Sequence, residues 1–197
     1  MVAHPASHSQ YDWLQQDALL VAPKLLGWEL VSYADGHETG GRIVEVEAYH
    51  GTEDPASHAF RGLSLRVAPM FLAGGAVYTY RSYGIHTCVN IVTGPAGVAQ
   101  AILIRALEPT IGLDIMASRR SLTNPRLLTS GPGRLGQALG ITLADSGTQL
   151  GSVFALRPST TQIEPKNIIA GPRIGITRAK DHPWRFMLTG SQFVSHR

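Results

Sequence analysis

The segment RIVEVEAY at residues 42–49 constrains the fold of this chain more than any other. Its apolar residues alternate with acidic and aromatic ones, and a period of two is typical of a β-strand with two different faces. The two faces carry Val44, Val46 and Ala48 on one side and Glu45, Glu47 and Tyr49 on the other. The apolar face would pack on a core. The opposite face is either a solvated edge with two surface glutamates, which is common for acids, or one wall of a cleft.

Length and composition indicate one compact domain. The chain has 197 residues, 44% of them hydrophobic, which is enough to bury one sizeable core but hardly two. We expect a flexible tail at residues 1–16 and a single domain at residues 17–197. The sequence contains neither an apolar run long enough for a membrane span nor a hydrophobic signal segment near residue 1. We therefore expect a soluble protein that is not secreted and stays in the cytoplasm.

Apolar periodicity and turn residues predict the remaining elements. The expected helices cover residues 17–26, 110–119 and 132–139, the second with Thr110 as its cap and the third with Pro132 in its first turn. The expected strands cover residues 29–32, 42–49, 77–83, 85–92 and 98–107. Because strands and helices do not alternate regularly, we predict an α+β fold with antiparallel hairpins.

The second predicted hairpin carries Tyr83 at its tip. An aromatic side chain gains no core burial there, so Tyr83 indicates a contact surface. Tyr78 and Tyr80 share one face of the first strand. Cross-strand packing is the better explanation for Tyr78, whereas packing and ligand binding explain Tyr80 equally well. Asn90 interrupts the apolar run CVNIV, and a buried amide there would bond either a ligand edge or the protein itself.

Two further patterns involve arginine. Arg105 interrupts the apolar run AILIRAL, and a guanidinium in a buried strand needs a carboxylate or an anionic ligand. Glu45 or Glu47 is the obvious partner. The segment TSGPGRLGQAL places small residues around a helix start, with Arg134 alongside, as in a phosphate-binding cradle. Such helix starts are common, and the pattern alone is a weak signal.

The net charge, the cysteine and the histidines indicate which partners, disulfides and metal sites to expect. The formal net charge of +3 slightly favours an anionic partner such as nucleic acid. Cys88 is the single cysteine, which excludes an internal disulfide, and its apolar surroundings predict burial. His50, His58 and His86 lie in separate segments without metal-ligand spacing. We expect no metal and no organic cofactor.

Several blocks together resemble the alkyladenine (3-methyladenine) DNA glycosylase family of alkylpurine repair enzymes. The blocks are GRIVEVEAY, EDPASHAF, MF, VYTYRSYGIHTCVNI, LIRALEP, SGPGRLGQALGI and RIGI, in the family's order from about Leu19 to the C-terminus. The resemblance implies a mostly antiparallel curved β-sheet with a protruding hairpin and surrounding helices. It also implies a base-excision-repair enzyme that flips alkylated or deaminated purines out of duplex DNA and hydrolyses the N-glycosidic bond, leaving an abasic site.

The resemblance also implies the catalytic residues. Glu47 looks like the general base that activates a water for attack on the sugar C1′. Arg105 and the backbone carbonyl of Ile174 match the groups that hold this water. The matched blocks contain no lysine, so they offer no Schiff-base nucleophile. We therefore expect a monofunctional enzyme that does not cleave the strand.

The remaining site residues bind the base or the duplex. Tyr49 and Tyr80 resemble the aromatics that sandwich the flipped base, with His58 at its edge and Asn90 crowding a guanine amino group; the expected pocket is Tyr49, His58, Tyr80, Asn90, Ala48 and Leu103. Tyr83 would fill the gap that the base leaves. The expected DNA contacts are Tyr83, Ile85, Arg61, Arg66, Met70 and Arg134. Flipping costs a few kcal/mol, and stacking returns ~1–3 kcal/mol per base. A monomer is expected.

The chain departs from the family's pattern in two loops and at the hairpin tip. The family often has Thr-Pro-Arg-Asn at Ser64–Val67 and Pro-Gly at Gly74-Gly75, and larger residues than Ile85 and His86 occur after the tip.

Three other classes of function stay open. A glycoside hydrolase would use Glu45 or Asp54 as a second acid. A non-catalytic damaged-DNA-binding protein would not need Glu47 and Arg105 together, and a structural nucleic-acid-binding domain would not prefer modified bases.

Overall fold

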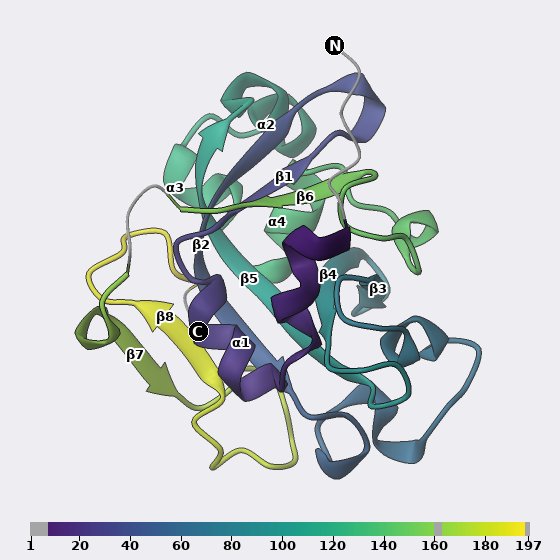
Figure 1. The fold of residues 1–197 in the computed structure, drawn as a ribbon. Helices are drawn as coiled ribbons and strands as arrows, with labels where there is room; N and C mark the ends of the chain where they lie inside the picture. The colour runs from purple at the N-terminus through teal and green to yellow at the C-terminus, as the bar shows by residue number, and fades with distance from the viewer. Residues whose placement is uncertain (1–7, 160–162, 196–197) are drawn as a thin grey trace.

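The computed structural model describes residues 8–159 and 163–195, and within them the strands form one eight-stranded antiparallel sheet (Figure 1). The strands are β1 (Glu29–Ser32), β2 (Thr39–Tyr49), β3 (Val77–Ser82), β4 (His86–Thr93), β5 (Gln100–Ile111), β6 (Phe154–Arg157), β7 (Ile168–Gly171) and β8 (Arg185–Leu188). The α-helices are α1 (Ala18–Leu25), α2 (Leu113–Arg120), α3 (Pro125–Leu128) and α4 (Pro132–Ala138), and short 3₁₀ turns occupy many of the connections. The predicted α+β class is confirmed. In the described ranges, no helix has the length and apolar character needed to cross a bilayer.

Strand β2 is the centre of the sheet. It pairs with β5 along one edge, while its other edge is shared by β1 at the start and β8 at the end. Shifts of register between Ile43 and Val46 mark bulges, which bend a strand and increase its twist. The sheet is curved as predicted. Because the end of β2 lies between β5 and β8, Glu45 and Glu47 are fully buried. The interpretation of a solvated edge is therefore wrong.

The apolar face of the sheet is covered largely by helices. Ala18, Val21, Ala22 and Leu25 of α1 are buried against the strands, and Figure 1 shows this helix in front of β2 and β5. Asp17 caps α1 through a 2.8 Å bond from the Leu19 amide, and the helix is followed by Gly27 in the left-handed region (φ +89). These features confirm the first predicted helix.

The N-terminal segment is more ordered than expected. A 3₁₀ helix spans His8–Gln15, and both Tyr11 and Leu14 belong to the core. The Tyr11 hydroxyl also bonds the backbone of Leu156 in β6. The predicted tail is therefore wrong for residues 8–16, whereas residues 1–7 lie outside the described ranges. A 3₁₀ helix repeats every three residues, so two buried residues three apart suffice to anchor it without an α-helical pattern.

The second predicted helix starts later than expected. Strand β5 continues through Pro109 to Ile111, and α2 begins at Leu113 after Gly112, which has a φ of +68. Proline can stay in the strand because β4 pairs only with residues 100–103 of β5, so one side of Pro109 needs no ladder bond among the described residues. Thr110 is thus an exposed strand residue rather than a helix cap.

Candidate active site

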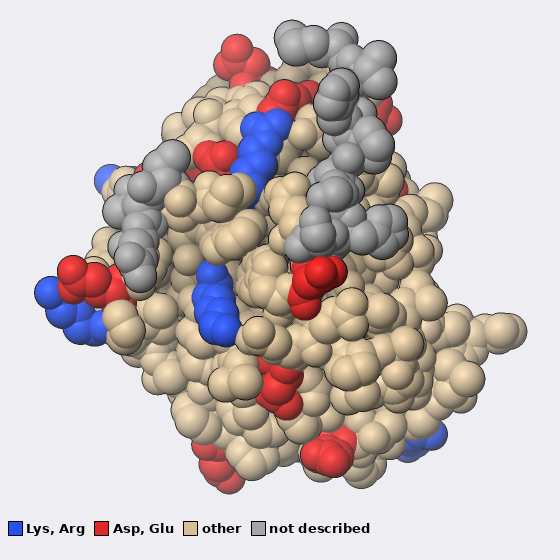
Figure 2. All heavy atoms as spheres, in the orientation of Figure 1, with Lys and Arg blue, Asp and Glu red and all other residues tan. Residues whose placement is uncertain are grey.

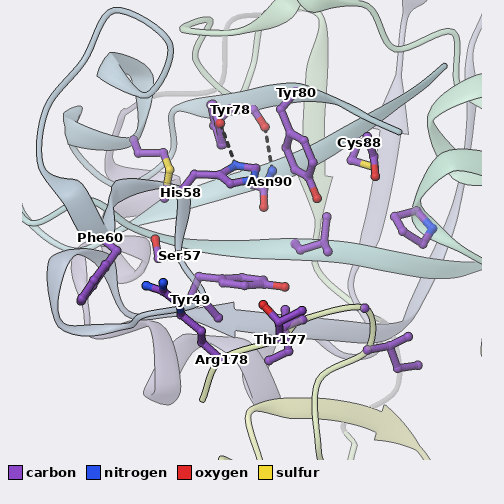
Figure 3. A pocket seen from close by; sticks show the side chains of 18 of the residues that line it. Tyr49, Ser57, His58, Phe60, Tyr78, Tyr80, Cys88, Asn90, Thr177 and Arg178 are labelled. Atoms are coloured by element: carbon purple, nitrogen blue, oxygen red, sulfur yellow. Dashed lines mark hydrogen bonds between the residues drawn. The ribbon is translucent and has the colours of Figure 1, made fainter. Parts of the chain in front are cut away.

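A cavity of about 630 Å³ opens between the β3–β4 hairpin, the end of β2 and residues 174–178. Its volume falls in the range of ~300–1,000 Å³ that is usual for small-molecule sites. Figure 3 shows the Tyr49 ring on one side of this cavity and His58, Tyr80 and Asn90 on the other. The lining includes ten of the predicted site residues: Tyr49, His58, Arg61, Met70, Tyr80, Tyr83, Asn90, Leu103, Arg105 and Ile174.

Glu47 lies directly behind the cavity wall and has no exposed surface. One carboxylate oxygen, Oε1, accepts a 2.7 Å hydrogen bond from the Ile174 amide and lies 3.1 Å from Arg105 Nη1. The other, Oε2, accepts a 2.9 Å bond from the Tyr49 hydroxyl. The predicted role of the Ile174 carbonyl stays a prediction, since it is the amide of this residue that contacts Glu47.

Glu45 holds Arg105 in place from the other side. Its Oε1 accepts bonds from Arg105 Nε at 2.8 Å and from Arg185 Nε at 2.7 Å, and it also accepts the Ser195 hydroxyl at 2.8 Å. Two acids and two arginines thus balance their charges in a buried cluster. Burial alone would lower the pKa of Arg105, but Glu47 and Glu45 raise it above its usual value, which keeps the guanidinium charged. The prediction that one of the two glutamates pairs with Arg105 is confirmed for both.

The Tyr49 ring rests on a buried ion pair that was not predicted. The guanidinium of Arg173 lies 4.6 Å from the ring centroid and bonds both Asp54 oxygens, at 2.5 and 2.9 Å, as well as the Ala48 carbonyl at 3.0 Å. Burial and then the charge of Glu47 raise the pKa of Tyr49 well above its usual value. Tyr49 is therefore a neutral donor whose ring orientation is fixed from beneath.

The opposite side of the cavity is an aromatic wall. The His58 and Tyr80 rings meet edge to face with their centroids 4.5 Å apart, and Tyr78 and Tyr80 stack at 5.8 Å. Tyr78 is 1% exposed, so this residue is packed in the protein, and its hydroxyl lies 3.0 Å from His58 Nδ1. Burial and the charge of Arg66 lower the pKa of His58, which favours the neutral ring. The Asn90 side-chain amide donates a 3.0 Å hydrogen bond to the Tyr78 carbonyl, and Asn90 also lines the cavity.

Comparison with known proteins identifies the family. The family model described as Methylpurine-DNA glycosylase (MPG) matches residues 12–192. The chain belongs to the methylpurine-DNA glycosylase family. A relative from Rhodopseudomonas palustris is 56% identical over 89% of this chain and 82% of its own length. A relative from Methanoculleus marisnigri is 49% identical over 93% of this chain and 96% of its own length. Both relatives carry the name "Putative 3-methyladenine DNA glycosylase".

In this methylpurine-DNA glycosylase family member, the hairpin tip is exposed at the edge of the cavity. Tyr83 is 86% exposed and Ile85 is 74% exposed, as expected for residues that contact a partner. Arg61 and Arg66 are exposed as well. The face shown in Figure 2, by contrast, carries acidic and basic side chains in scattered positions, so its described atoms present no continuous basic surface.

Three predicted site residues have different surroundings from those expected. Met70 is 2% exposed, so it supports the cavity from within and is too buried to contact DNA in this structure. The Ala48 side chain belongs to the core, and it does not line the cavity. Arg134 lines a neighbouring hollow of about 420 Å³ and bonds the Ser130 hydroxyl at 3.1 Å.

The glycines beside Arg134 have a packing explanation. A Cβ at Gly133 would lie 2.6 Å from the His86 ring, and one at Gly136 would lie 1.9 Å from the Thr87 carbonyl oxygen. Both glycines let α4 lie directly on β4. Close packing therefore accounts for this segment without a bound phosphate.

The glycoside hydrolase alternative is not supported by the positions of its acids. Glu45 neighbours Glu47 on the same strand and shares Arg105 with it, and Asp54 is bound to Arg173. Neither faces Glu47 across a cleft as a paired acid would.

Among the described residues, no group of three histidine, cysteine, aspartate or glutamate side chains is arranged to hold a metal ion.

Proposed function

We propose that the protein is a monofunctional DNA glycosylase that removes alkylated or deaminated purines from duplex DNA and leaves an abasic site. One observation carries the proposal: a buried carboxylate, Glu47, lies between Arg105 and the Ile174 amide directly behind an aromatic cavity. Family membership and the names of the relatives support the same substrate class.

An alkylated purine is already cationic, so its removal needs few groups; a deaminated purine is neutral and must also take up a proton, from solvent, as it leaves. The base flips into the cavity and stacks between Tyr49 and Tyr80. A water oxygen forms a bond to the sugar C1′ while the C1′–N bond breaks. The electron pair of the C1′–N bond leaves with the base. Glu47 takes the proton of the water, and the positive charge of Arg105 lies 3.1 Å from one of its oxygens.

The surface around the cavity would hold the duplex. Tyr83 at the hairpin tip would fill the space left by the flipped base, because an exposed aromatic ring can stack on the neighbouring bases. Arg61 and Arg66 would contact phosphates without reading sequence, as a repair enzyme that scans DNA requires. Such an enzyme would act as a monomer, in the cytoplasm of a bacterium where the chromosome lies.

The absence of a suitable amine supports simple hydrolysis. None of the described residues that line the cavity is a lysine, so a covalent imine with the sugar has no nucleophile there. The test is to incubate the protein with methylated duplex DNA, quantify the released bases by chromatography and examine the strands on a denaturing gel.

We expect free methylated purines and strands that break only after treatment with hot alkali. Strand breaks without alkali would refute the monofunctional mechanism. Preferential binding of damaged DNA with no released base would instead favour a non-catalytic damage-binding protein.

A further inference from the structure

The carboxylate of Glu47 has one oxygen with spare capacity. A carboxylate offers about four acceptor positions, two on each oxygen. Among the described residues, Oε1 is contacted by two donors, the Ile174 amide at 2.7 Å and Arg105 Nη1 at 3.1 Å. Oε2 is contacted by one donor, the Tyr49 hydroxyl at 2.9 Å. The position left for a water proton is therefore on Oε2, the oxygen that Tyr49 holds.

Tyr49 also lies where it can link the cavity to this oxygen. Its ring lines the cavity, whereas Glu47 has no exposed surface and lies behind that lining. The ring is supported by the Arg173 guanidinium 4.6 Å from its centroid, and Arg173 is in turn fixed by Asp54. The hydroxyl is thus carried on a ring with little freedom to turn, and its proton is aimed at the Glu47 carboxylate.

We propose that the Tyr49 hydroxyl is a positioning residue for the reaction, distinct from the stacking role of its ring: it fixes Oε2 of Glu47 so that this oxygen takes the proton of the attacking water. The inference rests on the proposed function. In the step, the water oxygen bonds to C1′ and its proton moves to Oε2. The electron pair of the C1′–N bond leaves with the base, and Tyr49 keeps its own proton.

The acidic side of the pH profile reports on this contact. The hydrogen bond from Tyr49 to Oε2 stabilises negative charge on this oxygen, so its loss should shift the acidic limb of the rate profile to higher pH. Other titratable groups surround the pair on every neighbouring element; they are Glu45, Tyr80, Cys88, Arg105, Arg173 and Arg185. Burial raises the pKa of both Tyr80 and Cys88, so neither ionises near neutral pH.

The test compares Tyr49→Phe with Tyr80→Phe, because both variants keep an aromatic ring in the cavity and remove one hydroxyl. Single-turnover excision of 7-methylguanine, a cationic base, from a duplex is measured as a function of pH, and affinity is measured with a duplex whose damaged nucleotide resists cleavage. For Tyr49→Phe we expect affinity close to that of the wild type, a lower maximal rate and an acidic limb about one pH unit higher. For Tyr80→Phe the acidic limb should keep its position.

A second variant covers the case in which Tyr49→Phe does not fold. A fluorinated tyrosine at position 49 has a more acidic hydroxyl and donates more strongly, so the acidic limb should move to lower pH. An unchanged limb in either folded variant would overturn the inference while the proposed function stands. Absence of excision by the wild type would refute the proposed function itself, and this inference with it.

Discussion

Replacing Asp54 with asparagine removes one charge from a fully buried ion pair. Both side chains of the Asp54–Arg173 pair have 0% exposed surface, and two hydrogen bonds at 2.5 and 2.9 Å join them. The pair is 119 residues apart in sequence, and it ties the segment after β2 to the segment before β8. In Asp54→Asn the guanidinium stays buried without this opposite charge, and its acceptors are the Ala48 carbonyl and the one amide oxygen of the new side chain.

The expected loss of stability follows from this geometry. Two unit charges about 4 Å apart interact with roughly 4 kcal/mol at an effective dielectric constant of about 20. Removing one partner of a buried pair costs about 3–5 kcal/mol, since the other charge is left uncompensated. We therefore expect Asp54→Asn to lower the free energy of unfolding by about 3–5 kcal/mol, a large share of the ~5–15 kcal/mol of a typical domain.

Urea unfolding followed by tryptophan fluorescence measures this change, and Trp184, whose ring lies 4.9 Å from the Arg173 guanidinium, reports on the site. The control is Glu164→Gln, which breaks the exposed pair with Lys166 and should leave the unfolding midpoint unchanged. Asp54→Asn within about 1 kcal/mol of the wild type would refute the reasoning. Apolar replacement of both partners, as in Asp54→Leu/Arg173→Met, removes the buried charge that the single variant leaves without a partner. A larger loss of unfolding free energy in this double variant than in Asp54→Asn would therefore also refute the reasoning.

The same pair predicts a pH dependence of stability. Burial would raise the pKa of Asp54, but hydrogen bonds from Arg173 and from the Ala56 amide outweigh it and lower this pKa below its usual value. A lowered pKa stabilises the fold above the pKa of the unfolded chain, about 3.9, and this contribution is lost as pH falls through the folded value. The difference between wild type and Asp54→Asn should therefore be constant near neutral pH and shrink below about pH 4.

Three further predictions concern the hairpin tip, the basic residues and the N-terminal segment. Tyr83→Ala should change the free energy of unfolding by less than about 0.5 kcal/mol but weaken binding of a damaged duplex by about 1–3 kcal/mol, as titration of a labelled duplex would show. Arg61→Gln and Arg66→Gln should each reduce the slope of log affinity against log salt by about one, and an unchanged slope would exclude a phosphate contact. Leu14→Ala should cost about 2–5 kcal/mol in urea unfolding, because Leu14 is fully buried; no loss would restore the view of a loose tail.

Local sequence patterns predicted much of the fold. The strand at Glu29–Ser32 has the predicted bounds, and the hairpin turns where Tyr83 precedes Gly84. These features depend on neighbouring residues, as do helix caps such as Asp17. The predictions failed where the local sequence was compatible with more than one structure. Thr110 was predicted to cap a helix after Pro109, although proline also suits a strand edge, and the 3₁₀ helix at residues 8–15 lacks an α-helical period.

The site depended on long-range contacts that no local pattern contains. Alternation along residues 42–49 showed that Glu45 and Glu47 share a face, but their burial requires β8, which lies about 140 residues further along the chain. The pairing of Asp54 with Arg173 and the contacts of Ser195 with Glu45 are of the same kind. The resemblance to a family supplied what periodicity lacked: that Tyr49, Tyr80, Asn90 and Arg105 meet at one cavity.

The most direct test of the account is single-turnover base release by the wild type and Glu47→Gln, from duplexes that carry hypoxanthine and from methylated DNA. Binding of the damaged duplex is measured in parallel with the same preparations. We expect abasic sites with the wild type, and binding without abasic sites with Glu47→Gln, because the amide cannot take the proton of water. Excision by Glu47→Gln at the wild-type rate would contradict the central role of this carboxylate, and damaged-DNA binding by the wild type without any base release would contradict catalysis altogether.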